Sequence, residues 1–274
     1  YYTLLRCEKL TGEKPWSEAW IMGYGLDEKG MKMSKSKGNA LDPLPVIQKS
    51  GADTFRFWSA SEINHGYDFR CSEQKIESTK KFLSKLWNVS RFLSSFPLID
   101  SANLTDTDKW ILSELDKLIS ECNDGYSKYN FFVPALAIRE FTWNVFAAHY
   151  IEMAKGRAYG IDFSDEERDA AVHTLHKVLS TILKLLAPIT PFITEYLWKT
   201  LYSKDSIHKE NIPETENVED FSQFTQNVIE FNSKVWNDKK AKNLSLKDSI
   251  KINVPENLQQ FKKDLVAMHN LKSD

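Results

Sequence analysis

The sequence predicts a mainly α-helical protein, with a short mixed region before the helices and a small α+β region after them. Apolar residues recur at three- and four-residue steps between about residues 72 and 202, while glycine and proline interrupt the segments on either side. The 274 residues, of which 42% are hydrophobic, suffice for one large or two ordinary domains. We expect boundaries that give regions 1–68, 69–204 and 205–274.

The first 60 residues combine β-like stretches with glycine turns. A strand is expected over residues 17–23, followed by a tight turn at Asp27–Gly30. A short helix is expected between Asp42 and Gly51, because Pro43 and Pro45 suit a first helical turn and glycine ends a helix. A second helix over Asp53–Ala60 completes this region.

Five helical stripes follow, and local signals mark their ends. Ser164 lies three residues before Glu167, which is the spacing of a capping box. The helices are expected to begin at Ser72, at Thr105 or Asp106, at Pro134, at Ser164 and at Pro191, and to end near Pro97, Gly125, Gly156, Pro188 and Tyr202. Stripes of this length joined by short polar links predict a helix bundle.

The tail returns to a mixed pattern. We expect a strand over residues 206–213, an amphipathic helix over Phe221–Trp236, an alternating strand over Ile250–Val254 and a final helix over Leu258–Met268. Together these elements predict a small α+β region.

Composition excludes several classes of protein. No apolar run approaches 18 residues and no signal peptide is present, which predicts no membrane span and a cytoplasmic location. Cys7, Cys71 and Cys122 are too widely spaced for a disulfide framework or a zinc site, and no metal site is expected. The chain starts without Met or a capping signal, which favours a piece of a longer protein.

The pentapeptide Lys32-Met33-Ser34-Lys35-Ser36 is the most informative segment. Its two ammonium groups lie on a glycine-flanked backbone, and they could close over a triphosphate and balance the charge of a departing pyrophosphate. The two serine hydroxyls and the loop amides would add donors, and Met33 could pin the closed loop. The alternative is a solvated, lysine-rich hairpin loop.

The pentapeptide, with the following Lys37-Gly38-Asn39 and the later Gly51-Ala-Asp-Thr-Phe-Arg56, resembles the second signature of class I aminoacyl-tRNA synthetases. The segments Tyr2–Arg6 and Lys81–Phe92 look most like valyl-tRNA synthetases, and isoleucyl enzymes are close. The resemblance implies the end of a Rossmann-type catalytic domain at 1–68 and an anticodon-binding helix bundle at 69–204. It also implies ATP with Mg²⁺, valine and tRNA(Val) as partners, and a monomer.

The same resemblance implies site residues. Lys32 and Lys35 would be catalytic, and they would bind the phosphates of ATP together with Met33, Ser34 and Ser36. The family's first signature, His-x-Gly-His, is not formed by any of the six histidines. We therefore expect the chain alone to activate no amino acid. An isoleucyl-type synthetase or a non-catalytic RNA-binding module remains the alternative.

Basic residues in the bundle are candidates for RNA contact, because RNA readers hold phosphates with Lys or Arg and stack unpaired bases on flat side chains. Lys81, Lys85 and Arg91 lie on the first bundle helix, and Lys155 and Arg157 lie near the end of the third. Solvated surface and compensation of a helix dipole are the alternatives for each. Four tryptophans are expected to be core anchors rather than base platforms: Trp87, Trp110, Trp143 and Trp198.

Overall fold

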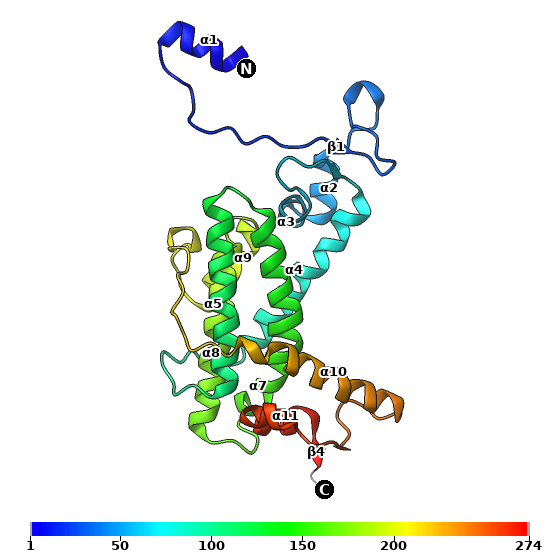
Figure 1. The fold of residues 1–274 in the computed structure, drawn as a ribbon, viewed down its shortest axis with the longest axis vertical. Coiled ribbons are helices and arrows are strands. Elements are labelled where there is room, and N and C mark those ends of the chain that lie inside the picture. Colours follow the sequence, from blue (N-terminus) through cyan, green and yellow to red (C-terminus); the bar gives the residue numbers. More distant parts are fainter. Residues whose placement is uncertain (1, 273–274) are drawn as a thin grey trace.

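A bundle occupies the middle of the molecule, with the N-terminal region at one end and the C-terminal helix α11 near the other (Figure 1). The computed structural model describes residues 2–272. The bundle contains α4 (Glu73–Leu93), α5 (Asp106–Ser127), α6 (Phe132–Glu140), the π-helix η2 (Phe141–Tyr150), α7 (Ile151–Ala158), α8 (Asp165–Leu186) and α9 (Pro191–Leu201). The prediction of a mainly helical fold is confirmed.

Short elements lie on both sides of the bundle. Before it come α1 (Tyr2–Thr11), β1 (Gly25–Leu26), the 3₁₀ turn η1 (Lys35–Lys37), α2 (Pro43–Ser50), α3 (Ala52–Glu62) and β2 (Phe69–Arg70). After it come the 3₁₀ turns η3 (Ile207–Lys209) and η4 (Ser222–Phe224), α10 (Thr225–Ala241), β3 (Ile250–Lys251), η5 (Glu256–Phe261), α11 (Lys262–His269) and β4 (Leu271–Lys272). Strand β1 pairs in parallel with β2, and β3 pairs in parallel with β4.

Two of the predicted helix starts, at Ser72 and Ser164, are confirmed by their caps. The Ser72 hydroxyl accepts the backbone N–H of Lys75 at 3.2 Å and begins α4. Ser164 and Glu167 form the expected capping box at the start of α8. These caps satisfy backbone N–H groups that have no partner inside the helix, which is why they mark the boundaries so well.

The second and third bundle helices each differ from the prediction in one feature. Helix α5 runs past Gly125 to Ser127, and a Cβ on Gly125 would lie 2.6 Å from Cδ of Pro134. Gly125 therefore permits the close approach of α6 and does not end α5. The helix expected from Pro134 to about Gly156 includes the π-helical stretch η2, in which the N–H of Ile151 donates to the carbonyl of Phe146 five residues earlier.

The expected strand over residues 17–23 is wrong. Residues 16–24 have no regular structure, and Trp20 and Ile21 are exposed. Pairing begins only at β1, where Gly25 and Leu26 are opposite Phe69 and Arg70. A strand needs a neighbouring strand, and β2 is only two residues long.

The tail contains less strand than expected. The strand expected over residues 206–213 is wrong, since this segment contains only the 3₁₀ turn η3 at Ile207–Lys209. Glu195 accepts the Ser206 hydroxyl and the N–H of Ile207 and so bends the chain there. The strand expected over residues 250–254 is reduced to the two residues of β3. The expected tail helices exist with shifted bounds, as α10 and α11.

Helix α3 joins the N-terminal region to the bundle through two charged side chains. Asp53 accepts the backbone N–H groups of Ile193 at 2.6 Å and Phe192 at 3.4 Å, at the start of α9. Arg56 donates to the carbonyls of Pro188 at 2.9 Å and Ile189 at 2.8 Å, just after α8. The segment Gly51–Arg56, noted above only for its resemblance, therefore clamps the corner between α8 and α9.

Two apolar clusters support the two ends of the molecule. A large one fills the bundle and extends to α10, α11 and β3. A small one of Val46, Trp58, Cys71 and Ile76 supports the N-terminal region, and Met33 packs against it. Among residues 2–272, no helix has the length and apolar character that a membrane crossing requires.

Candidate functional site

The lysine loop begins with the predicted tight turn. The N–H of Gly30 donates to the carbonyl of Asp27 at 2.9 Å, and Gly30 has a φ of 81°. The Asp27 carboxylate accepts the N–H groups of Lys29 at 3.0 Å and Met31 at 2.8 Å. Lys32 then forms an antiparallel bridge with Leu26. The turn thus brings the pentapeptide back beside β1.

Asn39 closes the loop from its other end. Its amide nitrogen donates to Asp27 Oδ2 at 2.8 Å and to the carbonyl of Lys32 at 3.3 Å, while its oxygen accepts the N–H of Ser34 at 3.0 Å. The hydrogen bond from Asn39, followed by that from the N–H of Met31, lowers the pKa of Asp27. The turn at Asp27 and the segment ending at Asn39 were both noted from the sequence, but the pairing of the two side chains was not predicted.

The serines shape the middle of the loop. The Ser34 hydroxyl accepts the N–H of Lys37 at 3.3 Å and caps η1, and Gly38 ends the turn with a φ of 67°. The hydroxyl oxygens of Ser34 and Ser36 are 3.2 Å apart. The loop is therefore ordered by its own side chains, while Lys35, Ser36 and Lys37 are exposed.

The side chain of Lys32 lies at the surface, whereas that of Met33 packs against the small apolar cluster. The Lys32 ammonium is exposed and lies 3.5 Å from the ring centroid of Tyr24. The Met33 side chain faces inward, since a Cβ on Gly25 would lie 2.7 Å from Met33 Cε. Met33 therefore anchors the loop on the small apolar cluster, and the cations at 32 and 35 are left at its surface.

Helix α4 presents a second basic surface. Lys81 and Arg91 are exposed, Lys85 is half-buried, and no ion pair joins any of them to a carboxylate within residues 2–272. A groove of about 410 Å³ lies between α4 and η2, lined by Glu77, Lys80, Lys81, Ser84, Lys85, Asn88 and Trp143. The expected residues Lys81 and Lys85 thus share one groove.

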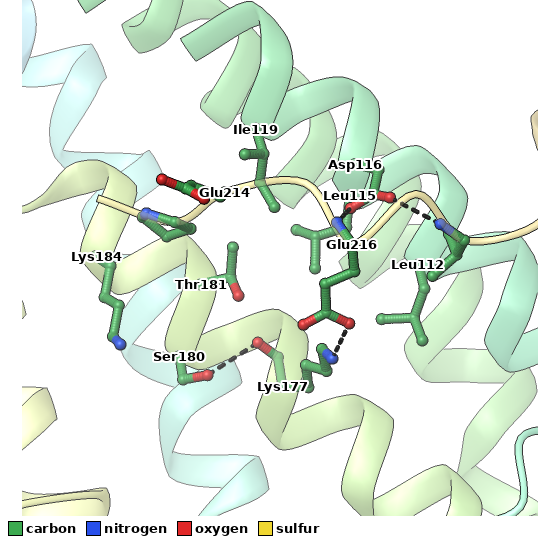
Figure 2. Close-up of a pocket in the computed structure, with 12 residues that line it drawn as sticks. Leu112, Leu115, Asp116, Ile119, Lys177, Ser180, Thr181, Lys184, Glu214 and Glu216 are labelled. Carbon is green, nitrogen blue, oxygen red and sulfur yellow. Dashed lines mark hydrogen bonds and ion pairs between the residues drawn. The ribbon is translucent and has the colours of Figure 1, made fainter. Parts of the chain in front are cut away.

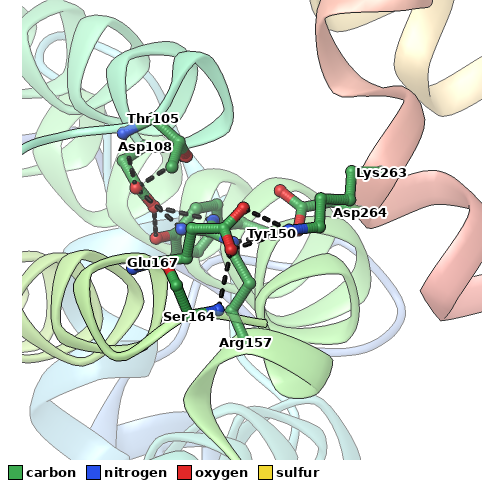
Figure 3. A network of polar contacts seen from close by, with 8 residues as sticks. All are labelled: Thr105, Asp108, Tyr150, Arg157, Ser164, Glu167, Lys263 and Asp264. Carbon is green, nitrogen blue, oxygen red and sulfur yellow. Dashed lines mark hydrogen bonds and ion pairs between the residues drawn. The ribbon is translucent and has the colours of Figure 1, made fainter. Parts of the chain in front are cut away.

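The prediction that Arg157 contacts RNA is wrong. Only 1% of Arg157 is exposed, and its guanidinium donates to both carboxylate oxygens of Asp108 at 2.8 Å and to Asp264 at 2.9 Å (Figure 3). Asp108 also accepts the Tyr150 hydroxyl at 2.6 Å. Burial raises the pKa of Asp264, and the nearby guanidinium opposes that rise. Arg157 ties α5 and α11 to α7 and cannot reach a ligand.

Lys155 lies close by but is only half-buried. Its ammonium pairs with Glu152 at 2.5 Å and lies 5.7 Å from the ring centroid of Phe92. Because one carboxylate already balances its charge, Lys155 is a weaker candidate for phosphate contact than Lys81.

Two of the four tryptophans are not core anchors. Trp110 and Trp198 are buried as expected, but 42% of Trp87 and 37% of Trp143 are exposed. The ring of Trp87 stacks on that of Tyr196, with centroids 5.5 Å apart. The spacing of apolar residues did not show that the rings of Trp87 in α4 and Trp143 in η2 face the solvent.

A further cavity of about 290 Å³ lies between α5, α8 and the chain at residues 213–218 (Figure 2). Its lysines are already paired, Lys177 with Glu216 and Lys184 with Glu210. Asp116 accepts the N–H groups of Glu216 and Val218, each at 3.1 Å, which fixes this part of the chain. The cavity is therefore a less suitable anion site than the loop or the α4 groove.

Within residues 2–272, no group of three or more His, Cys, Asp or Glu side chains could hold a metal ion. The three cysteines are all free. The exposed lysines of the two basic surfaces can bind phosphates.

Comparisons with known proteins identify the class of protein. The family described as the anticodon-binding domain of tRNA ligase matches residues 108–254, and tRNA synthetases class I (I, L, M and V) match residues 1–72. The chain belongs to the class I tRNA ligases that carry this anticodon-binding domain. The resemblance noted from the lysine loop is therefore confirmed.

The particular relatives are valine–tRNA ligases. The chain is 40% identical to that of Nanoarchaeum equitans, 37% to that of Aeropyrum pernix and 41% to that of Pyrobaculum aerophilum. These matches cover 98–99% of the chain but only 34–35% of each relative. The chain thus spans about a third of the length of the relatives it matches.

A solved structure shares the fold. A LeuRS–tRNA–LeuAMS ternary complex from Agrobacterium radiobacter superimposes with a TM-score of 0.61 at 22% identity. The match covers 78% of this chain and 26% of the other. At this identity the likeness supports the fold alone.

Proposed function

We propose that this chain is the tRNA-holding part of a valine–tRNA ligase and that it contributes a lysine loop for the phosphates of ATP. The observation that carries the proposal is the identity of 37–41% to valine–tRNA ligases along 98–99% of the chain. The complete ligase would join valine to tRNA(Val) with ATP. The chain alone would activate no amino acid.

Three regions divide this work. Residues 1–68 would be the end of a Rossmann-type catalytic domain, residues 69–204 the anticodon-binding bundle and residues 205–274 a small α+β region. The small apolar cluster supports a first region that packs on the start of α4, since it joins Val46 and Trp58 to Ile76. The buried contact of Arg157 with Asp264 means that the third region folds against the second.

The loop would act on the leaving group. As the carboxylate of valine attacks the α-phosphate, the bond to pyrophosphate breaks and negative charge grows on the departing oxygens. Lys32 and Lys35 would balance that charge, with Ser34 and Ser36 as supporting donors. Met33 would hold the loop in place, and Mg²⁺ would accompany the phosphates of ATP, as is usual for that ion.

The bundle would hold tRNA through phosphate contacts. Lys81, Lys85 and Arg91 have no carboxylate partner within residues 2–272, so their charge is available to RNA. Lys155 would add a weaker contact at the far end of α7. Such contacts set affinity and orientation, and they make binding fall as salt rises.

Binding of the purified chain to tRNA transcripts tests the proposal. At about 0.1 M ionic strength, we expect tighter binding to tRNA(Val) than to tRNA(Ile) or an unrelated tRNA, measured by fluorescence anisotropy. Equal affinity for all three would overturn the assignment to valine. ATP–pyrophosphate exchange by the chain above that of its Lys35→Ala variant would overturn the expectation that it is inactive alone.

A further inference from the structure

We propose that the indole ring of Trp143 is a stacking platform for an unpaired nucleobase of bound RNA, and that Lys81 and Lys85 hold the adjoining phosphates. The inference rests on the proposed function, because it specifies how the bundle contacts RNA. It assigns to Trp143 the role of base platform, in place of the core anchor that the sequence predicted.

The first step is the exposure of Trp143. It is 37% exposed, and no other aromatic ring stacks on it within residues 2–272. Trp87, which is similarly exposed, already stacks on Tyr196. A large aromatic side chain at the surface without a ring partner retains apolar area that a nucleobase would cover.

The second step is the backbone that places the ring. Trp143 lies in the π-helix η2, whose neighbouring residues Thr142 and Phe146 are buried. The wider turn of a π-helix changes which residues face outward, and such turns are frequent at functional sites. Because η2 follows α6 without a break and continues directly into α7, the ring is carried by a rigid helix.

The third step is the charge of the groove beside the ring. Lys85 Nζ lies 5.8 Å from the Trp143 ring centroid, and Lys80 and Lys81 line the same groove. The only carboxylate in the lining, Glu77, pairs with Lys49 outside it. The groove therefore has uncompensated positive charge beside an apolar plane.

This combination favours single-stranded RNA over other occupants. A base can stack on the ring while its phosphates lie along the row of lysines, which is how many proteins bind unpaired strands. An acidic peptide would use the lysines but leave the ring without a matching plane.

The test compares Trp143→Leu, Trp143→Phe and Lys81→Ala, with Trp16→Leu as control. Trp16 is 43% exposed but lies in the N-terminal region, in a pocket with Trp20 and His65. Affinity for a tRNA(Val) transcript and for a short mixed-sequence single strand is measured at several salt concentrations. Circular dichroism establishes that each variant is folded.

Stacking and phosphate contact predict different results. Trp143→Leu should weaken binding to both RNAs by about 5- to 100-fold without changing the salt dependence. Trp143→Phe should recover most of the affinity, and Trp16→Leu should not alter it. Lys81→Ala should weaken binding and reduce the slope of log Kd against log salt by about 0.7–0.9.

A second readout follows the ring itself. With 5-fluorotryptophan incorporated, the ¹⁹F resonance that disappears in Trp143→Phe should shift when RNA is added, and that of Trp16 should not. An unshifted Trp143 resonance together with full affinity in Trp143→Leu would overturn the inference. If the wild-type chain still binds RNA through Lys81, the proposed function survives that result; if it binds no RNA, both fail.

Discussion

The lysine loop and the surface of α4 both present lysines to solvent, but they are held in place by different forces. The loop is positioned by hydrogen bonds that involve the side chains of Asp27, Asn39 and Ser34, and it lies on a cluster of four buried residues. The lysines of α4 project from a helix whose other face, including Leu86 and Leu93, is part of the large core. Polar contacts break one at a time, whereas a packed core yields as a unit. We therefore expect the loop to move while the α4 surface stays fixed.

The largest expected effect is on the bundle. Arg157→Ala leaves the carboxylates of Asp108 and Asp264 buried without their partner, and it should lower the free energy of unfolding by about 3–5 kcal/mol. Urea unfolding followed by circular dichroism measures this loss. Lys155→Ala, two residues away on the surface, should change it by less than about 1 kcal/mol. Equal effects of the two variants would contradict the buried role.

Acid should loosen the C-terminal region next. Burial first, then the charges of Lys239 and His149, lower the pKa of His269 to about 4 from an ordinary value of 6.5. Because the unfolded chain binds the proton more readily, stability is complete above pH 6.5 and falls as the pH drops toward 4. The loss at pH 4 is as much as about 3 kcal/mol.

Unfolding measured from pH 7 to pH 4 tests this loss. His269→Gln should flatten the pH dependence, while His208→Gln, at an exposed position, should leave it unchanged. A pH profile that His269→Gln does not alter would assign the acid sensitivity to other groups.

The junction between the two regions should be more tolerant. Asp53→Ala leaves the partly buried N–H of Ile193 without its acceptor, at a cost of about 1–3 kcal/mol. Asp53→Asn keeps an acceptor, and burial already raises the pKa of the native carboxyl, so the amide should restore most of the stability. Calorimetry should show the α3 region separating from the bundle in Asp53→Ala alone. One undivided transition in that variant would show that other contacts hold the two regions together.

The smallest effect on stability is expected in the loop. Asn39→Ala removes the contacts to Asp27, Lys32 and Ser34, but it should lower global stability by only about 1 kcal/mol. Hydrogen exchange at the N–H of Ser34 should become faster, while exchange within α4 should not change. Ser36→Ala is the control, since within residues 2–272 the hydroxyl of Ser36 has a hydrogen-bond partner only in that of Ser34. Faster exchange in α4 as well would remove the distinction between loop and bundle.

The sequence predicted the helix caps and the tight turn, because each of these depends on residues that are close together in the chain. The cap at Ser72, the capping box at Ser164 and the turn at Gly30 all involve residues within four positions of each other, and all are confirmed. Arg157 was misassigned because its partner Asp264 is 107 residues away. Periodicity also could not show the π-helical turn at Trp143, because the pattern of apolar residues does not reveal which backbone hydrogen bonds form.

The lysines of the loop were predicted by resemblance to a family, and their chemistry by their charge. Their support was not predicted, because Asn39 and Asp27 meet only when the turn has formed. The clamp of Asp53 and Arg56 onto residues 188–193 was missed for the same reason, since it joins positions more than 130 residues apart. Hydrogen bonds between residues far apart in the chain are therefore the part of the site that the sequence did not predict.

That clamp also has a mechanical consequence. Arg56 donates to the carbonyl of Ile189, after the end of α8, and Asp53 accepts the N–H of Ile193, at the start of α9. Helix α8 extends for 22 residues from this corner. At 1.5 Å per residue the helix is about 33 Å long, so a tilt of about 5° at the corner would move its far end by roughly 3 Å. A small change in angle at the corner beside α3 would therefore become a displacement of several ångström at the far end of α8.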